Sequence, residues 1–355
     1  MAKGKLLIGL DIGTSSIKFC QVREGRRNYQ LVNFGLAYLP PETIVDGALI
    51  ASNTVADALR ELFESHRVKG REVAISVSGH SVIIRKISLP PMKAEELRDS
   101  IQWEAEQYIP FDLNDVYLDF EILREASPES NQMDVLLVAA KKDVVDDYLE
   151  VIKGVGLTPR VVDVDCFSVQ NQFEINYEVP LTETIALINI GASVTNVNII
   201  AGGITMFTRD ISPLGGNQYT EELQKHLDVS YDEAETLKAG GDLGADSDAV
   251  VPQEVERVMY GVSENVAAEI QRSLDFYSAN SAEGPISRIY LSGGTAKVPS
   301  LYRIIEQKLG VPVEIINPFK NIEVDGNRFN LEYLREVAPM ATVATGLALR
   351  RTAER

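Results

Sequence analysis

The sequence predicts an α/β protein built from two similar lobes, with a smaller α+β subdomain inserted into the first lobe. Two glycine-rich turns, at residues 11–16 and 189–195, carry one pattern. In each, an apolar strand runs into Asp or Asn followed by Ile and Gly, then into small or hydroxyl residues and a second strand. Because the elements after each turn also follow one order, we infer an internal duplication.

The composition excludes several classes of protein. The chain has 355 residues, of which 45% are hydrophobic, so it can bury the cores of two or more lobes. A net charge of −18 argues against nucleic acid or a bare anionic membrane as the main partner. We find no signal peptide and no run of about 18 apolar residues, so we expect a cytoplasmic chain without a membrane span. The two cysteines, in apolar stretches, are typical of a reducing compartment.

The first half begins with three runs that alternate apolar and polar residues. They predict antiparallel strands at Lys5–Ile12, Ile17–Arg23 and Gln30–Leu39. A helix capped by Ser52 is expected next, and a strand at residues 72–78 follows it. The apolar face of this helix is expected to consist of Val55, Leu59, Leu62 and Phe63.

The second half repeats that order. Three strands are expected at Thr184–Asn189, Val194–Ala201 and Ile204–Arg209. A helix at about residues 217–227 and a strand at residues 288–291 complete the match with the first half. Each half is therefore expected to form one lobe.

Two segments interrupt this pattern. Residues 82–163, with the strand that ends at residue 164, give the order strand, helix, strand, strand, helix, strand, a β-α-β-β-α-β unit that can pack a core of its own. Residues 228–284 are expected to be helical, with an acidic loop at 240–248 that lacks EF-hand spacing and is expected to be a disordered turn. The predicted parts are a first lobe core (1–81, 164–183 and 338–355), the insert (82–163), a second lobe core (184–227 and 285–337) and a helical subdomain (228–284).

A third glycine-rich turn lies near the end of the second half, where an apolar strand ends in Ser292-Gly293-Gly294-Thr295 and Pro299 is expected to open a helix. Glycines let the backbone approach a flat ligand closely, and a helix N-terminus favours an anion. Turns rich in Gly, Ser and Thr present N–H and hydroxyl groups to phosphate oxygens. One such turn is commonly an ordinary hairpin, but three in this order indicate a nucleotide site between two lobes.

Together these turns resemble the actin-like ATPase superfamily, whose fold consists of two duplicated ribonuclease-H-like lobes. The resemblance covers essentially the whole chain, including a small-residue helix at 341–346. It implies that ATP and Mg²⁺ bind between the lobes. The residues implied to bind nucleotide are Asp11, Gly13, Thr14, Ser15, Ser16 and Lys18 in the first phosphate loop; Asn189, Gly191, Ala192, Ser193, Thr195 and Asn196 in the second; Gly215, Gly216 and Asn217 after it; Glu235 and Lys238 at the base; and Gly293, Gly294, Thr295 and Pro299 in the adenosine loop.

Several of these implied roles compete with plainer ones. Lys18 either reaches a phosphate or belongs to the polar face of its strand. Glu235 and Lys238 either hold the ribose and adenine or form an exposed helical ion pair. Asp165, the candidate catalytic residue, either orients the attacking water or caps a helix. Asp11 is the expected anchor of the hydrated Mg²⁺. In relatives an Asp takes the place of Asn189, which puts the metal geometry and the rate of hydrolysis in doubt.

The inserted β-α-β-β-α-β unit resembles the branch that contains FtsA and PilM. Pro-Pro-Met-Lys before its first helix and Tyr108-Ile109-Pro110-Phe111 after it are similar to the PilM family of type IV pilus proteins, and no room is expected for the C-terminal amphipathic helix of FtsA-type chains. This resemblance implies a cytoplasmic ATP-binding scaffold with slow or no hydrolysis. It also implies that the N-terminal segment of the inner-membrane protein PilN binds in a groove between the first lobe and the insert. Alternatives are an FtsA-like division protein and a small-molecule kinase of the same fold.

Overall fold

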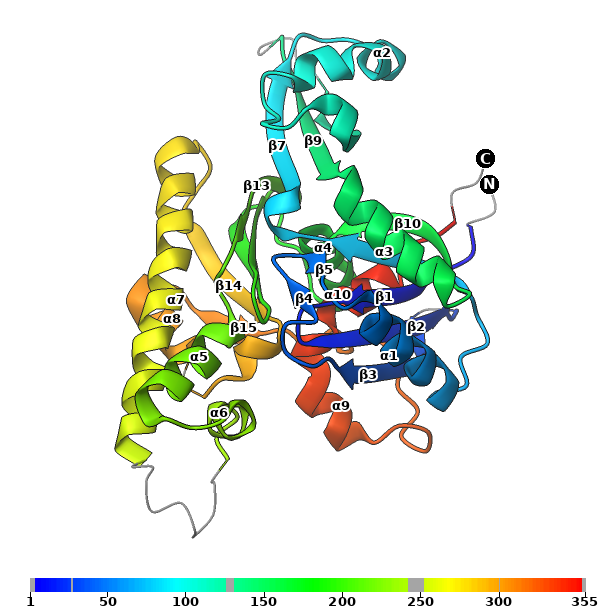
Figure 1. Cartoon of the computed structure of the whole chain (residues 1–355). Coiled ribbons are helices and arrows are strands. Elements are labelled where there is room, and N and C mark those ends of the chain that lie inside the picture. Colours follow the sequence, from blue (N-terminus) through cyan, green and yellow to red (C-terminus); the bar gives the residue numbers. More distant parts are fainter. Residues whose placement is uncertain (1–3, 27, 126–130, 242–251, 300, 353–355) are drawn as a thin grey trace.

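The computed structural model describes residues 4–26, 28–125, 131–241, 252–299 and 301–352. Two lobes lie side by side, and a smaller subdomain projects from the first lobe (Figure 1). Most of the predicted acidic loop, residues 242–248, lies outside the described residues. In the described ranges, no helix combines the length and the apolar character needed to cross a bilayer.

The first lobe is built on a five-stranded sheet in the order β10-β6-β1-β2-β3. The first three strands along the chain are antiparallel neighbours, which confirms the predicted meander. β6 and β10 continue the sheet on the other side of β1, parallel to it and to each other. The strands are β1 (Ile8–Ile12), β2 (Ser16–Glu24), β3 (Tyr29–Tyr38), β6 (Glu72–Val77) and β10 (Thr158–Val164).

The sheet of the second lobe has the order β13-β12-β11-β14-β15 and copies the first. β11 pairs antiparallel with β12 and parallel with β14, just as β1 pairs with β2 and β6. The inferred duplication is therefore confirmed. The strands are β11 (Thr184–Ile190), β12 (Thr195–Ala201), β13 (Ile204–Ile211), β14 (Ile286–Ser292) and β15 (Val313–Ile315).

The outer helix of the first lobe is α1 (Ser52–Ser65), which follows the short strands β4 (Ile44–Val45) and β5 (Ala48–Leu49). Its buried residues are the predicted ones: Val55, Leu59, Leu62 and Phe63. The expected cap is wrong, because Ala51 occupies the N-cap position and no side chain bonds the first turn. The apolar periodicity determines which face is buried, whereas the cap depends on the path of the preceding loop.

Two central helices pack between the sheets, α4 (Asp165–Asn176) and α10 (Thr342–Leu347). Their apolar side chains join one cluster with residues of both lobes. Phe173 of α4 and Leu347 of α10 lie in this cluster with Leu7 of the first lobe and Leu187 of the second. The lobes therefore share a core, and a further helix, α9 (Leu331–Val337), precedes α10.

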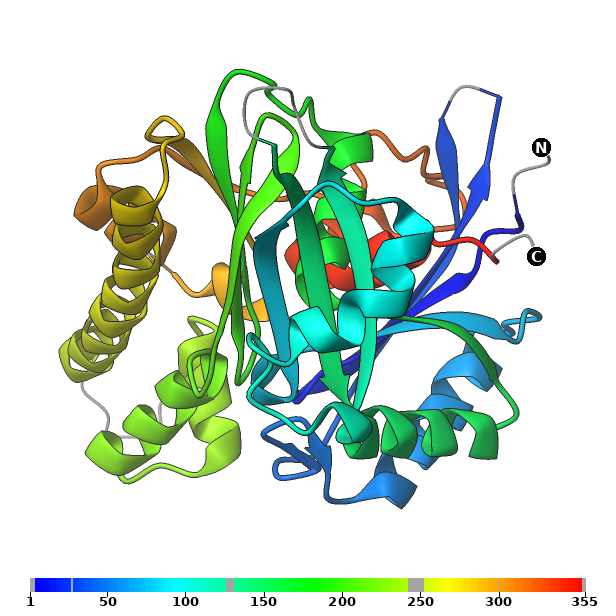
Figure 2. The ribbon, with the colours of Figure 1, turned by 90° about the horizontal axis from the view of Figure 1, so that it is seen from above.

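The insert contains the three-stranded sheet β7-β9-β8, with α2 (Ala94–Ala105) packed on one face (Figures 1 and 2). Its strands are β7 (Val82–Leu89), β8 (Val116–Arg124) and β9 (Met133–Lys141), and α3 (Lys142–Gly154) follows β9 directly. The strand expected to complete the unit, residues 160–164, is not in this sheet. It lies in β10, which pairs with β6 of the first lobe.

The position of α3 explains why β10 joins the sheet of the first lobe. Tyr148 and Ile152 of α3 lie in the same buried cluster as Leu59 of α1, so α3 packs on the first lobe. The chain has thus already returned to the first lobe when β10 begins. Sequence order alone does not show which of two sheets a strand joins.

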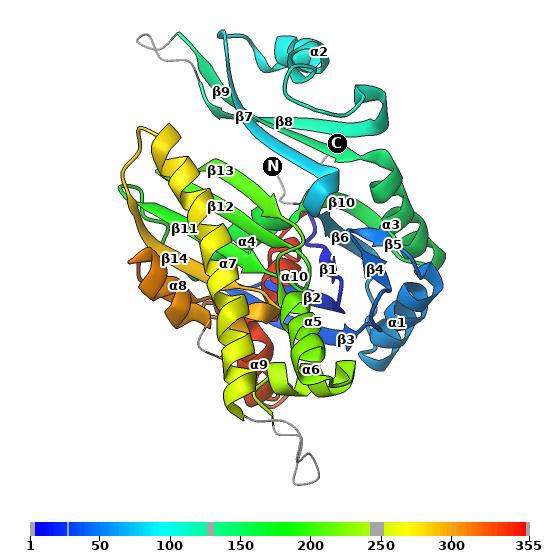
Figure 3. The ribbon, with the colours of Figure 1, turned by 60° about the vertical axis from the view of Figure 1, so that its left-hand side comes forward.

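The helices of the second lobe are α5 (Gly216–Leu227), α6 (Tyr231–Lys238), α7 (Pro252–Asn280) and α8 (Leu301–Leu309). The long helix α7 crosses one face of the second sheet (Figure 3). Val266 and Ile270 of α7 pack there on Ile188 and Val197 of the sheet. This arrangement leaves the turns at the ends of β1, β11 and β14 facing the space between the lobes.

Candidate functional site

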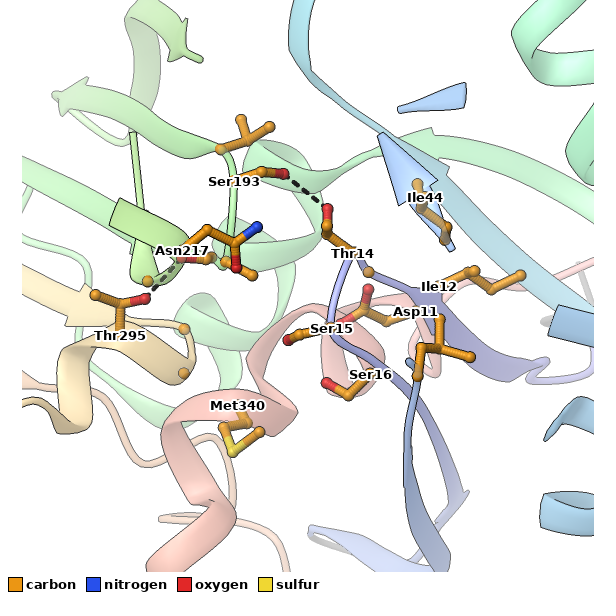
Figure 4. Close-up of a pocket in the computed structure, with 18 of the residues that line it drawn as sticks. Asp11, Ile12, Thr14, Ser15, Ser16, Ile44, Ser193, Asn217, Thr295 and Met340 are labelled. Atoms are coloured by element: carbon orange, nitrogen blue, oxygen red, sulfur yellow. Dashed lines mark hydrogen bonds between the residues drawn. The ribbon is translucent and has the colours of Figure 1, made fainter. Parts of the chain in front are cut away.

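A cavity of about 990 Å³ lies between the lobes where the three glycine-rich turns meet (Figure 4). Both lobes, the segment just before the insert and the helix α3 after its sheet contribute to the walls. Most residues that the sequence assigns to nucleotide line it: Asp11, Gly13, Thr14, Ser15, Ser16, Lys18, Asp165, Asn189, Gly191, Ala192, Ser193, Asn196, Gly216, Asn217, Glu235, Lys238, Gly293, Gly294 and Thr295.

The first turn joins β1 to β2 and is closed by the N–H of Gly13, which donates to the Ser16 carbonyl at 3.1 Å. Lys18 lies opposite Asp11 in the β1–β2 register. Its Nζ donates to Asp11 Oδ2 at 3.1 Å and to the Ser16 carbonyl at 3.2 Å. The ammonium group is thus held at the turn and lines the cavity, so a contact between Lys18 and a phosphate stays a prediction.

The second turn, between β11 and β12, faces the first across the cavity. The N–H of Gly191 donates to the Val194 carbonyl at 2.9 Å, which repeats the closure of the first turn. The hydroxyls of Thr14 and Ser193 lie 2.7 Å apart and link the lobes (Figure 4). Two turns of similar geometry therefore approach one point from opposite sides, as the duplication predicts.

The third turn follows β14 and packs on the second. Gly293 has a φ of +88°, and a Cβ there would lie 2.2 Å from the Ile190 carbonyl oxygen, so only glycine fits. Thr295 Oγ1 donates to the Gly191 carbonyl at 2.7 Å (Figure 4). The N–H of Asn217, in the first turn of α5, donates to the Ala192 carbonyl at 2.8 Å. The second turn, the third turn and the start of α5 therefore form one unit.

Glu235 and Lys238 of α6 form the predicted ion pair. Lys238 Nζ also donates to Thr220 Oγ1 on α5 at 2.9 Å, and Thr220 Oγ1 donates to Glu235. The Lys238 side chain is largely buried and lines the cavity, so the pair is not merely an exposed ion pair. It lies at the end of the cavity bounded by α6, where a nucleoside can make contacts.

Asp165 does not cap α4, because Val164 is the N-cap residue and has no side-chain cap bond. The Asp165 carboxylate instead accepts a hydrogen bond of 2.5 Å from Ser76 Oγ at the end of β6. Burial, followed by the charge of Asp11, raises the pKa of Asp165 to about 7, while hydrogen bonds from Ser76 and Ser78 oppose the shift. A carboxyl group with this pKa can hold or release a proton near neutral pH.

Asn189 lies in a buried chain of polar side chains. Its Oδ1 accepts from Ser292 Oγ at 3.2 Å, and its Nδ2 donates to Asn196 Oδ1 at 2.9 Å. Asn196 Nδ2 donates in turn to Asp210 Oδ1 on β13 at 2.8 Å. Burial raises the pKa of Asp210, although its hydrogen bonds oppose the shift.

Three expected residues do not line the cavity. Thr195 is fully buried and donates to the Leu214 carbonyl at 2.9 Å, so its hydroxyl is used within the lobe. A Cβ on Gly215 would lie 2.5 Å from the Gly191 carbonyl oxygen, so this glycine permits a close backbone approach. Pro299 is exposed in a turn, and α8 is described from Leu301. Thr195 and Gly215 therefore support the walls of the cavity from within the second lobe, and Pro299 lies outside the walls.

Sequence reasoning missed other residues of the walls. Ser76 lies at the end of β6 and lines the cavity. A hydroxyl residue at the end of a predicted strand could have indicated this position. Tyr148 comes from α3, and Tyr38 and Met340 come from the end of β3 and from the segment before α10. Asp210 does not line the cavity, but it is opposite Asn196 in the β12–β13 register, which the sequence does not show.

Two buried hydroxyls in the walls suit a phosphate ligand. Ser16 Oγ and Ser212 Oγ have no hydrogen-bond partner within the described part of the chain, although both residues line the cavity. Buried polar atoms normally have partners, so a bound anion would satisfy them. Across the described ranges, no three His, Cys, Asp or Glu side chains form a metal site by themselves. A cation in the cavity would therefore rely on water and phosphate oxygens for most of its ligands.

Comparisons with known proteins agree with this architecture. A family model described as type IV pilus assembly protein PilM matches residues 9–352. A solved structure described as a PilM-PilN type IV pilus biogenesis complex is 28% identical, with a TM-score of 0.86 and 99% of each chain covered.

More distant proteins share the fold. The ethanolamine utilization protein EutJ from Carboxydothermus hydrogenoformans is 16% identical with a TM-score of 0.58, over 98% of this chain and 90% of that chain. The cell division protein FtsA of Pseudomonas aeruginosa is 25% identical over 354 residues, which cover 89% of this chain and 84% of FtsA. The fold is the actin-like ATPase fold that the sequence predicts.

Proposed function

The chain belongs to the PilM family of type IV pilus assembly proteins, and from this premise we propose that it is an ATP-binding scaffold that docks an inner-membrane partner. The partner is the cytoplasmic N-terminal segment of a PilN-type protein, and the scaffold works at the cytoplasmic side of the inner membrane. The proposed binding of ATP rests on the two glycine-rich turns that face each other across the cavity. The hydroxyl oxygens of Thr14 and Ser193, one from each turn, lie 2.7 Å apart.

The walls of the cavity divide into parts that suit the parts of ATP. The N–H groups and hydroxyls of the two turns, with Lys18, suit the phosphates. The adenosine loop and the Glu235–Lys238 pair suit the nucleoside. Mg²⁺ would neutralise charge on the phosphate oxygens, and Asp11 is the residue that would hold it through water. Asp11 Oδ2 is already paired with Lys18, which leaves Oδ1 for this contact.

Turnover is proposed to be slow or absent. Asn189 supplies no carboxylate to the second phosphate turn, and its amide is engaged by Ser292 and Asn196. Asp165 lines the cavity and is the one residue that we assign to orienting water. Nucleotide then acts mainly as a conformational ligand that sets the relation between the lobes. A turnover number of about 1–100 s⁻¹, as in kinases, would contradict this.

The partner is proposed to bind between the first lobe and the insert. Ile84 and Val138 of the insert sheet and Phe167 of α4 are only partly buried at this junction. β10 forms the edge of the first sheet, so its outer backbone groups suit an added strand. The structure described as a PilM-PilN complex supports the identity of the partner.

The first experiment is calorimetric titration of the chain with a synthetic peptide of the cytoplasmic N-terminus of PilN, with and without Mg-ATP. Stoichiometric binding of the peptide and of ATP is expected. A peptide of the same composition in scrambled order serves as the control. Binding of ATP without binding of the peptide in either condition would contradict the docking proposal and favour the division-protein or kinase alternative.

Those alternatives have their own measurements. An FtsA-like protein is expected to sediment with lipid vesicles in the absence of a partner, whereas the scaffold is expected to stay in solution. A small-molecule kinase is expected to transfer phosphate from ATP to a member of a metabolite panel. We expect neither result.

A further inference from the structure

Both chain connections between the first lobe and the insert pass along the wall of the nucleotide cavity. On entry, Ser78, Gly79 and His80 line the cavity just before β7 begins. On exit, β9 runs directly into α3, whose Val144 and Tyr148 line the cavity. Both ends of the segment that carries the insert are therefore in contact with the cavity.

The entry connection is attached to the opposite lobe by one side chain. The N–H of Gly79 donates to Asp210 Oδ2 at 2.7 Å, although the two residues lie 131 positions apart. Asp210 belongs to β13, the edge strand of the second sheet, and β13 lies beside β7 (Figures 1 and 3). This hydrogen bond joins the second lobe to the root of the insert.

The same carboxylate is linked to the nucleotide turns. Its Oδ1 accepts from Asn196, Asn196 accepts from Asn189, and Asn189 accepts from Ser292 of the strand that leads into the adenosine loop. Asn189 and Asn196 line the cavity. A continuous chain of hydrogen bonds therefore runs from the start of the adenosine loop, past the second phosphate turn, to Gly79.

We propose that Asp210 is a positioning residue that holds the root of the insert against the second lobe and thereby couples nucleotide binding to partner binding. The proposal rests on the function proposed above, because it assumes ATP between the lobes and a peptide at the insert. The two binding free energies are linked through the position of the insert, and such linkage is reciprocal. Asp210 touches neither ligand and acts through Gly79 and Asn196.

Two donors, the Gly79 N–H and the Asn196 amide, require two acceptor atoms on the side chain at position 210. Asp210 receives one hydrogen bond on each oxygen, so Asp210→Ala leaves the Gly79 N–H and the Asn196 amide without partners. Asp210→Asn can keep both bonds. This requires the side-chain amides of Asn189 and Asn196 to rotate so that their N and O atoms exchange places. The amide introduced at position 210 then donates to Asn196 and still accepts from the Gly79 N–H. At the other end of the chain, Ser292 Oγ accepts from Asn189 instead of donating to it.

The first test measures the hydrogen bond itself by hydrogen–deuterium exchange without ligands. We expect Asp210→Ala to speed exchange at the Gly79 amide about tenfold and Asp210→Asn to stay near the wild type. Asp325→Ala is the control, because Asp325 also accepts from a backbone N–H, that of Asn327, but lies outside the cavity walls and outside β10. Unchanged exchange at Gly79 in Asp210→Ala would overturn the proposal.

The second test measures coupling as the ratio of the peptide Kd without and with Mg-ATP. The wild type is expected to show a change of about fivefold or more in either direction. Asp210→Ala is expected to bring the ratio close to one, whereas Asp210→Asn and Asp325→Ala are expected to keep the wild-type ratio. Circular dichroism shows whether Asp210→Ala remains folded, so that a ratio close to one in the folded variant reports lost coupling and not unfolding.

The outcomes separate this proposal from the proposed function. If the wild type binds both ligands but the ratio is one, or if Asp210→Ala keeps the wild-type ratio, the coupling role of Asp210 is wrong and the scaffold function stands. If the wild type binds neither ATP nor the peptide, the proposed function fails and the coupling role fails with it. The exchange measurement then still shows whether Asp210 holds Gly79.

Discussion

The pair formed by Lys18 and Asp11 is the most direct residue-level test of the nucleotide site. Both side chains are largely buried, and the ammonium group is held by a carboxylate and a backbone carbonyl. A hydrogen bond to a charged group contributes about 1.5–3 kcal/mol, so Lys18→Ala is expected to weaken ATP binding by roughly 10- to 100-fold. Calorimetry measures this change.

Lys5→Ala is the control for that substitution, because Lys5 is exposed, pairs with Glu72 at 3.5 Å and does not line the cavity. We expect it to leave ATP affinity unchanged. Circular dichroism shows whether Lys18→Ala remains folded. Equal ATP affinity in folded Lys18→Ala and the wild type would show that the first turn is not a phosphate loop.

Asp165 gives a prediction about stability and pH. Its pKa is raised to about 7 in the folded state, mainly by burial, whereas an unfolded Asp titrates near about 4. Between about pH 4 and 7 the folded state therefore binds more protons, so the free energy of unfolding falls as pH rises. Asp165→Asn is expected to raise the free energy of unfolding by on the order of 2 kcal/mol at about pH 8, and to change it little at about pH 4.

Urea denaturation without nucleotide or metal measures this difference. Asp57→Asn on α1 is a suitable control, because its side chain is 76% exposed. An equal increase in the free energy of unfolding at both pH values would show that burial does not disfavour the charged form of Asp165.

At the scale of elements, the third glycine-rich turn, at residues 292–295, depends on a single glycine. Gly293→Ala places a Cβ against the Ile190 carbonyl and keeps a residue with a side chain at a φ of +88°. We expect it to cost more than about 3 kcal/mol of stability and to abolish ATP binding. Urea denaturation and calorimetry measure the two effects.

Gly310→Ala separates strain from steric overlap. Gly310 also has a positive φ, +66°, but no atom lies within 4 Å of the position that an added Cβ would take. We expect a loss of about 1 kcal/mol and normal ATP binding. If both substitutions cost the same, the close approach of the adenosine turn to β11 does not limit residue 293.

Elements with strong local patterns were predictable from the sequence. The buried face of α1 and the two glycine-rich hairpins follow from periodicity and turn chemistry. The sheet that β10 joins did not follow, because both sheets offer an edge and the choice depends on where α3 packs. The same reason explains why Asp210 was missed, since its role comes from strand register and from the opposite lobe.

At the scale of the molecule, the lobes meet where α4 crosses α10. A Cβ on Gly346 of α10 would lie 1.7 Å from the Ser168 carbonyl oxygen of α4. We predict that Gly346→Ala pushes these helices apart and lowers the stability of the whole chain by about 2–4 kcal/mol. Denaturation followed by probes in each lobe measures this loss.

The control is Gly261→Ala in α7, where no atom lies within 4 Å of the added Cβ. Alanine is the better helix former, so this substitution is expected to stabilise the protein by about 0.5–1 kcal/mol. Equal effects of the two substitutions, or a loss confined to one lobe in Gly346→Ala, would contradict a shared core between the lobes.

The duplicated lobes, the three turns and most of the residues at the cavity could be predicted from the amino-acid sequence. Strand periodicity, glycine positions and hydroxyl residues act locally, so their consequences can be read along the chain. Three contacts could not be predicted in this way: Asp165 bonds Ser76, β10 joins the first sheet, and Asp210 holds Gly79. Each of these contacts joins segments far apart in sequence, and which contacts form depends on how the lobes and the insert pack together.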